Sequence, residues 1–166
     1  MEIHRARPED APFVREIARE AYKPYVKRIG KEPALMVANF PALIEAAEVW
    51  VAADFTEILG YIVMRPGQDT LHIENVAVSP PRHGEGVGKA LLEFAEAEAA
   101  RVGIPRMDLY TNAKMRENLS LYPRLGWTEV ARRTEDGFER VYFEKSVSPH
   151  RAKILLTPIA LAMPCD

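Results

Sequence analysis

The chain has 166 residues, of which 48% are hydrophobic and 28% are charged, and its formal net charge is −2. These values are ordinary for a soluble protein with one sizeable core, and the nearly neutral charge gives no reason to expect nucleic acid or an anionic membrane as a partner. The single cysteine, Cys165, excludes an internal disulfide and a cysteine-cluster metal site.

The sequence carries neither a membrane segment nor a metal-binding pattern. MEIHRARPED (1–10) lacks the apolar core of a signal peptide, and no uninterrupted apolar segment reaches the roughly 20 residues that cross a bilayer. The histidines are scattered without ligand spacing, at His4, His72, His83 and His150. We therefore expect a cytoplasmic protein with no membrane partner and no metal.

The N-terminal part of the chain predicts a strand followed by two helices. MEIHRA (1–6) alternates between apolar and polar residues, which is typical of a strand. Asp10 can cap the helix that follows, and we expect Pro24 to end it because proline disrupts a helix interior. Asn39 and Pro41 indicate the start of a second helix. The residues expected on the buried sides of these helices are Val14, Ile17, Ala18 and Ala21, then Leu43, Ile44 and Ala47.

The pattern then changes to strands. EVWVAAD (48–54), ILGYIVMR (58–65) and TLHIENVAV (70–78) are joined by short turns, which predicts an antiparallel meander. A helix from about Val87 to Val102 follows, with Gly103 as its stop.

The rest of the chain predicts one more strand–helix unit and a hairpin. The expected elements are a strand at 106–112, a helix at about 114–125, and strands at 127–133 and 140–146 around the turn Asp136-Gly137. The strand–helix–strand linkage implies one parallel pair. The expected fold is therefore α/β (α+β), a mixed, mostly antiparallel sheet of about six to seven strands with helices on both faces. Residues 1–146 form one expected domain, and the apolar, proline-broken tail 147–166 is left without a predicted structure.

Three glycines fall within five residues in HGEGVG (83–88), between a predicted strand and a predicted helix. Glycine lets a ligand approach backbone amides closely, and the start of a helix favours anions. The phosphate loop GxxxxGK[ST] does not fit, because Gly84 and Gly88 are only four positions apart and Ala90 replaces the hydroxyl. The dinucleotide fingerprint GxGxxG does not fit either, because its third glycine comes one residue early. A glycine-rich turn without a ligand is the alternative for this motif alone.

Two segments together resemble the GNAT superfamily of N-acetyltransferases. IENVAVSPPRHGEGVGKALLEFAEAEA (73–99) is similar to the family's [Q/R]xxGx[G/A] motif with its preceding strand. LYTNAKMRENLSLYPRLGWTEVARR (109–133) is similar to the second signature, an Asn four residues before a Tyr and then LG with an aromatic residue. The resemblance covers roughly residues 1–146. It departs from the family at His83, which stands where the family has Gln or Arg.

The resemblance implies that acetyl-CoA is the co-substrate and that the strand and loop hold it. It assigns the pantetheine arm and acyl group to Val76, Ala77 and Val78. It assigns the pyrophosphate to the amides of Gly84, Glu85, Gly86, Val87 and Gly88, with His83 and Lys89 assisting. Asn118 would form a hydrogen bond to the pantetheine or to an adjacent loop. Without the motif, the expectation for Asn118 is a solvent-facing helix residue.

The resemblance also implies roles for two ionisable residues. Tyr122 would donate a proton to the sulfur as the thiolate leaves, and the alternative is a tyrosine that packs in the core. Glu74 is the candidate general base, since supplying a neutral amine at pH 7 costs about 4–5 kcal/mol. By alternation it shares a strand face with His72, which is the second candidate for the base, and a structural salt bridge is the alternative for both.

The acceptor pocket is expected between the first helices and the C-terminal hairpin. Tyr22, Tyr25 and Arg28 could line it, and Arg28 could bind a carboxylate of the acceptor or be a solvated surface charge. The implied activity is N-acetylation of a primary amine, on a small molecule or a peptide, with a homodimer as one expected state. The alternatives are a non-catalytic acyl-CoA-binding or sensor module of the same fold and a nucleotide-binding enzyme.

Overall fold

The strands and helices follow one another in the order that the sequence predicts. The computed structural model describes residues 1–148, so that most of the tail 147–166 lies outside the described part. The strands are β1 (Glu2–Arg5), β2 (Val49–Ala53), β3 (Ile58–Pro66), β4 (Thr70–Val78), β5 (Arg106–Asn112), β6 (Thr128–Glu135) and β7 (Phe138–Ser146). The α-helices are α1 (Ala11–Ile29), α2 (Phe40–Glu45), α3 (Val87–Arg101) and α4 (Arg116–Arg124), and short 3₁₀ turns are η1 (Pro8–Asp10), η2 (Ala34–Val37) and η3 (Pro80–Arg82).

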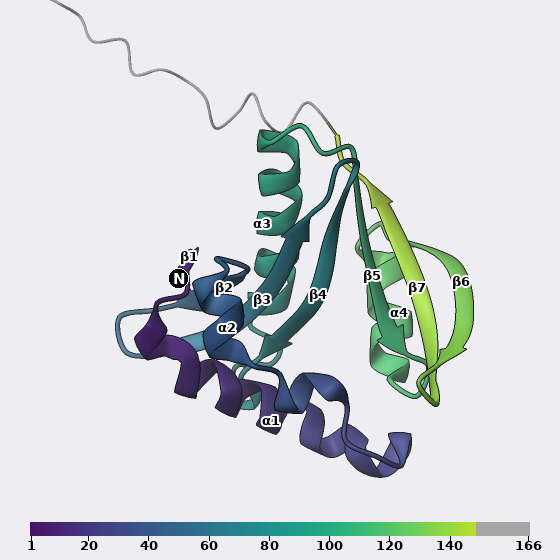
Figure 1. The fold of residues 1–166 in the computed structure, drawn as a ribbon, viewed down its shortest axis with the longest axis horizontal. Coiled ribbons are helices and arrows are strands. Elements are labelled where there is room, and N and C mark those ends of the chain that lie inside the picture. The colour runs from purple at the N-terminus through teal and green to yellow at the C-terminus, as the bar shows by residue number, and fades with distance from the viewer. Residues whose placement is uncertain (149–166) are drawn as a thin grey trace, which may run out of the picture.

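The strands form one sheet in the order β1-β2-β3-β4-β5-β7-β6 (Figure 1). Neighbouring strands are antiparallel except β4 and β5, which are parallel and are connected through α3. The sequence prediction of a mixed, mostly antiparallel sheet with one parallel pair is therefore confirmed. The hairpin of β6 and β7 turns at Asp136 and Gly137, whose φ values of 52° and 75° suit the tight turn that the sequence predicts.

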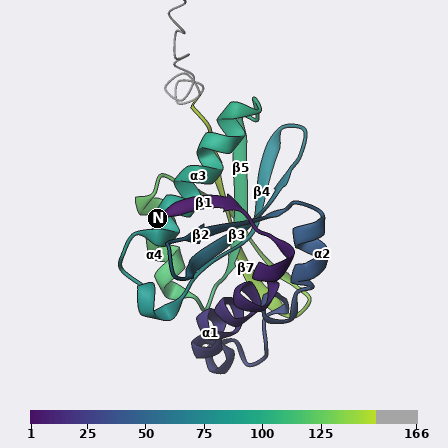
Figure 2. The ribbon, with the colours of Figure 1, turned by 90° about the vertical axis from the view of Figure 1, so that its left-hand side faces the viewer.

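Helices cover both faces of the sheet, and each face has its own apolar core (Figure 2). Alternation along β2 divides its side chains between the two cores: Val49 and Val51 pack with α1 and α2, whereas Ala52 packs with α3. One core centres on Leu91 and Ala95 of α3, and the other includes residues of α1 and α2. The helices thus enclose the middle of the sheet from both sides.

Two details of the N-terminal helices differ from the sequence prediction. Helix α1 does not end at Pro24 but continues to Ile29 and stops at Gly30, whose φ is 84°. Pro24 lies on the exposed side of the helix, so the carbonyl group of Glu20 that it leaves unbonded can be solvated. Ala47 is exposed with a φ of 58°, because α2 already ends at Glu45.

The start of α1 also differs in its capping. The Asp10 side chain does not cap this helix but accepts a hydrogen bond from the backbone N–H of Arg7, 2.7 Å away, within the preceding turn. Asn39 does cap α2, since its side chain accepts from the N–H of Ala42. The second helix therefore starts where the sequence predicts.

Candidate functional site

The parallel strands β4 and β5 separate near the middle of the sheet. They pair only from Thr70 and Arg106 to Ile73 and Leu109, although β4 runs on to Val78 and β5 to Asn112 (Figure 1). Beyond Ile73, β4 keeps its partner β3, so its β5-facing main-chain groups have no strand partner. A cavity of about 540 Å³ occupies this opening.

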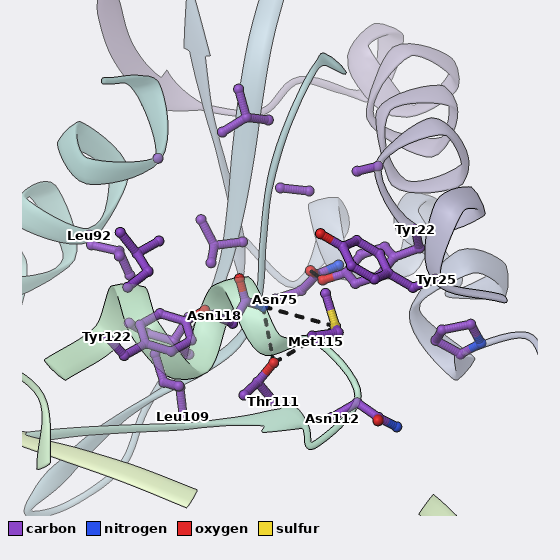
Figure 3. A pocket seen from close by; sticks show the side chains of 18 of the residues that line it. Tyr22, Tyr25, Asn75, Leu92, Leu109, Thr111, Asn112, Met115, Asn118 and Tyr122 are labelled. Atoms are coloured by element: carbon purple, nitrogen blue, oxygen red, sulfur yellow. Dashed lines mark hydrogen bonds between the residues drawn. The ribbon is translucent and has the colours of Figure 1, made fainter. Parts of the chain in front are cut away.

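The cavity is lined by elements that are far apart in the sequence (Figure 3). Tyr22 and Tyr25 of α1 form one wall, and Leu92 of α3 and Tyr122 of α4 form the opposite one. The lining also includes Glu74, Asn75, Val76, Ala77 and Val78 of β4. Most of the residues that the sequence singled out thus lie around one space.

The glycine loop lies at one end of this cavity. Gly84 and Gly86 have φ values of 83° and 82°, and a Cβ atom at either position would meet nothing within 4 Å. Glycine is therefore required here by the backbone angle and not by crowding within the protein. Gly88 is tighter, because its Cβ would lie 3.4 Å from a methyl group of Val78.

Several amides of the loop are free to bind a ligand. Within residues 1–148, the N–H groups of Gly84, Gly86, Val87 and Gly88 donate no backbone hydrogen bond, and Val87 begins α3. The amide of Glu85 differs, since it donates to the carbonyl of Arg82 at 3.4 Å. Free amides at the start of a helix form an anion-binding site.

The side chains around the loop are mostly held by neighbours. His83 Nε2 donates to the carbonyl of Val78, 3.1 Å away, while Arg82 lines the cavity and is paired with Glu57. Lys89 is exposed, also lines the cavity, and lies 3.8 Å from Glu93. This end of the cavity therefore carries two cationic side chains beside the free amides.

Tyr122 is buried in the cavity wall that lies opposite α1, and it lines the cavity (Figure 3). Its ring packs against Trp127 and Phe143, with centroid distances of 6.1 and 5.3 Å. Burial raises the pKa of Tyr122 to about 12, so the hydroxyl keeps its proton at neutral pH. Within the described residues the Tyr122 hydroxyl makes no hydrogen bond. Since every fully buried polar side-chain atom in those residues has a hydrogen-bond partner, the Tyr122 oxygen is not fully buried. The hydroxyl is therefore accessible and free to donate to a ligand.

Glu74 lies in the cavity at the point where β4 leaves β5, and it belongs to a row of ionisable groups. Its Oε2 lies 3.0 Å from Nε2 of His72, and Nδ1 of the same ring lies 2.6 Å from Oδ1 of Asp108 on β5. Carboxylates only accept hydrogen bonds, and a His72 ring protonated on both nitrogens can donate to both of them. The hydrogen bond between them lowers the pKa of Glu74 and raises that of His72, against the effect of burial on each group.

The hydroxyl of Tyr22 is hydrogen-bonded within the protein. It donates to Oδ1 of Asn75 at 2.7 Å, and the Asn75 amide donates to the hydroxyl of Tyr61 at 2.6 Å. Burial raises the pKa of Tyr22 well above its ordinary value. This buried network ties α1 to β3 and β4.

Three other residues singled out from the sequence take different positions. Tyr25 lines the cavity, but Arg28 does not; its Nη1 pairs with both carboxylate oxygens of Glu117 at 3.0 Å. Asn118 lines the cavity and donates to Oγ1 of Thr111 at 3.0 Å, which links α4 to β5 (Figure 3). The structure thus brings Tyr25 and Asn118 to the cavity and places Arg28 in a surface ion pair.

Several cavity residues were missed at the sequence level, chiefly Asn75, Tyr110 and Arg140. Asn75 is the polar residue among alternate apolar positions of the sequence, which could have marked it. Arg140 has no local signal, since only the pairing of β7 with β5, which aligns Arg140 with Asn112, brings it to the cavity.

The described residues contain neither a membrane-spanning helix nor a cluster of metal-binding side chains. Within residues 1–148, no helix combines the length and the apolar character needed to cross a membrane. In the same range, His, Cys, Asp and Glu side chains form no group of three that could hold a metal ion.

Comparison with known proteins relates this site to one family. The family described as Acetyltransferase (GNAT) family matches residues 11–127 of the chain. That match includes the strand β4, the glycine loop, α3 and α4.

Two relatives with assigned activities match by sequence. One is an aminoalkylphosphonate N-acetyltransferase from Salmonella typhimurium, 37% identical over 57 residues, which are 34% of this chain and 37% of the relative. The other is a mycothiol acetyltransferase from Jonesia denitrificans, 28% identical over 82 residues, which are 48% of this chain and 26% of the relative. The match spans well under half of either relative.

Solved structures share the fold at lower identity. The PaiA N-acetyltransferase from Thermoplasma acidophilum, solved in complex with coenzyme A, superposes with a TM-score of 0.75 and 21% identity, over 87% of this chain and 98% of that chain. The fold is therefore that of an acetyltransferase.

Proposed function

This chain belongs to the acetyltransferase (GNAT) family, and we propose that it transfers an acetyl group from acetyl-CoA to a primary amine by direct attack of the amine on the thioester. We assign this activity to a domain formed by residues 1–146. The observation that carries the proposal is one cavity that joins free loop amides, a carboxylate and a protonated phenol.

The loop end of the cavity fits the pyrophosphate of coenzyme A. The free amides of Gly84, Gly86, Val87 and Gly88 supply donors, and Arg82 and Lys89 supply positive charge. The amide of Glu85 is engaged with Arg82, so in this proposal Glu85 contributes less than its neighbours. The imidazole of His83, held on the Val78 carbonyl, closes the loop against β4.

The unpaired edge of β4 fits the pantetheine arm. An amide-containing chain that lies along Val76, Ala77 and Val78 can form the hydrogen bonds that β5 does not make there. Asn118 stands across the cavity from this edge and fixes the start of α4 through Thr111. The thioester of acetyl-CoA, the activated group of the reaction, would then lie between Glu74 and Tyr122.

In this proposal Glu74 accepts the proton that the acceptor amine loses as its nitrogen bonds to the acetyl carbon. His72 holds the Glu74 carboxylate in place through a hydrogen bond that also lowers its pKa. Tyr122 donates its proton to the sulfur, which takes the electron pair of the broken carbon–sulfur bond. No metal takes part in these steps.

Thiol release from acetyl-CoA tests the proposal. The assay uses the full chain with a panel of primary amines, and coenzyme A binding is measured separately by calorimetry. We expect coenzyme A to bind and at least one amine to accelerate thiol release. Binding without any acceleration would favour a sensor module, and ATP or NAD binding in place of coenzyme A would favour a nucleotide-binding enzyme.

A further inference from the structure

The charged side chains that line the cavity fall into two groups. Arg82 and Lys89 stand at the glycine loop, where the proposed pyrophosphate binds. At the other end, among the described residues, the lining charges are Glu74 and Arg140. The acceptor half of the cavity therefore presents one negative and one positive group.

Arg140 lines the cavity and is held by carboxylates of its own hairpin. Its Nη1 donates to Glu135 at 3.0 Å, its Nη2 lies 3.9 Å from Asp136, and its side chain is only 17% exposed. Neither Glu135 nor Asp136 lines the cavity, although Arg140 does. The two carboxylates thus hold the guanidinium from outside the cavity and do not occupy the cavity itself.

Tyr110 contacts Arg140 directly and is close to Glu74 through His72. The guanidinium of Arg140 stands 4.6 Å from the centre of the Tyr110 ring, and the ring of His72, which holds Glu74, stacks on Tyr110 at 6.3 Å. Arg140 therefore lies beside the same aromatic ring as His72, the hydrogen-bond partner of Glu74. Tyr25, Ile29 and Phe138 add apolar surface around them.

We propose that the acceptor is a small amino acid, with its amine at Glu74, its carboxylate at Arg140 and an apolar side chain against Tyr25 and Phe138. The inference rests on the proposed function and names its substrate class. A guanidinium matches a planar carboxylate with two parallel hydrogen bonds, and it repels a second amine. A polyamine is therefore a poor acceptor. Arg28, the carboxylate binder considered from the sequence, is paired with Glu117 outside the cavity.

The first test compares acceptors on the unmodified chain. L-phenylalanine, L-leucine and 3-amino-3-phenylpropanoate are each assayed beside the corresponding carboxamide, with spermidine as the polyamine. We expect kcat/KM for at least one amino acid to exceed that of its carboxamide by about tenfold or more. Equal or better turnover of the carboxamides or of spermidine would overturn the proposal.

The second test changes the subsite. Arg140→Gln should lower the ratio of amino acid to carboxamide turnover by about tenfold, and Arg140→Lys should lower it less. The ratio cancels the intrinsic reactivity of each amine. Arg133→Gln is the matched control, because Arg133 lies on the same hairpin, 3.9 Å from the same Glu135, and does not line the cavity. An unchanged ratio in Arg140→Gln would overturn the proposal.

A binding measurement separates this inference from the proposed function. Calorimetry with the coenzyme A-loaded chain compares each amino acid with its carboxamide. Selective binding of an amino acid without acetylation would support the subsite and defeat the proposed activity. Acetylation of neutral amines with no preference for a carboxylate would support the activity and defeat the subsite. Failure of every amino acid to bind or react would overturn the inference.

Discussion

His72 and Glu74 are joined by a hydrogen bond of 3.0 Å on the same face of β4, at the point where this strand leaves β5. The other nitrogen of the ring is bonded to Asp108, so the imidazole has no freedom to turn. Arg65 lies 3.5 Å from the same Glu74 oxygen. The Glu74 carboxylate is therefore held in one position at the cavity by its contacts with His72 and Arg65.

This pair predicts a dependence of stability on pH. The pKa of His72 is raised in the folded chain, so its contribution is present below the unfolded value of about 6.5 and is lost as the pH rises through the folded value. The pKa of Glu74 is lowered, so its contribution is present above about 4.5 and is lost as the pH falls through the folded value. Urea unfolding should show that His72→Gln costs about 0.5–1 kcal/mol near pH 6 and less near pH 9.

A second histidine serves as the control for this measurement. His4 lies on the edge strand β1, where its ring contacts the carbonyl of Arg5, and His4→Gln is measured at the same two pH values. A constant cost of His72→Gln across the range would show that the ring acts through packing against Tyr110 and not through its charge.

Removing the Glu74 carboxylate tests the base directly. Glu74→Gln keeps the size of the side chain but cannot take a proton, so kcat should fall by about 100-fold while coenzyme A affinity changes little. Glu129→Gln, an exposed change on β6 in an ion pair with Arg132, is the control for loss of a carboxylate. Turnover of Glu74→Gln at the parent rate would assign proton removal to water or to another group.

The sheet could be predicted from the sequence because period-two patterns and turn residues are local signals. Strands β4 and β5 were predicted with the bounds that the structure has, at 70–78 and 106–112. The helix α1 was predicted too short, because whether a proline is tolerated depends on which side of the helix faces solvent. That side is fixed by the packing of α1 on the sheet, which a local pattern does not contain.

The candidate site was predictable only where its residues share a segment. The loop glycines, Glu74 and Tyr122 stand in recognisable patterns, and all of them lie at the cavity. Arg140 was missed because its position depends on the register of β5 with β7. Arg28 is the converse case: its place near Tyr25 suggested the cavity, but α4 supplies Glu117 as its partner. Ion pairs between distant segments are decided by the fold.

The role of Tyr122 can be separated from its packing. Tyr122→Phe keeps the ring against Trp127 and Phe143 and removes a hydroxyl that bonds to nothing within the described residues, so stability should change little. We expect kcat to fall by about 100-fold and coenzyme A affinity to stay nearly constant. Tyr61→Phe is the contrasting variant, since it leaves the buried Asn75 amide without its acceptor and should cost about 1–3 kcal/mol of stability. If Tyr122→Phe turns over at the rate of the unmodified chain, Tyr122 acts only in packing.

The glycine loop predicts a loss of cofactor binding that backbone strain alone does not explain. Gly86 has a φ of 82° and open space where a side chain would stand, so Gly86→Val introduces both strain and bulk at the proposed pyrophosphate site. Gly103 has a φ of 78° and equally open surroundings, but it follows α3 away from the cavity. Both valine variants should lose at least about 1–2 kcal/mol of stability, measured by urea unfolding. Only Gly86→Val should abolish coenzyme A binding in calorimetry, because only there does the new side chain occupy the path to the free amides of Val87 and Gly88. Equal coenzyme A affinity in the two variants would mean that the loop does not bind the pyrophosphate.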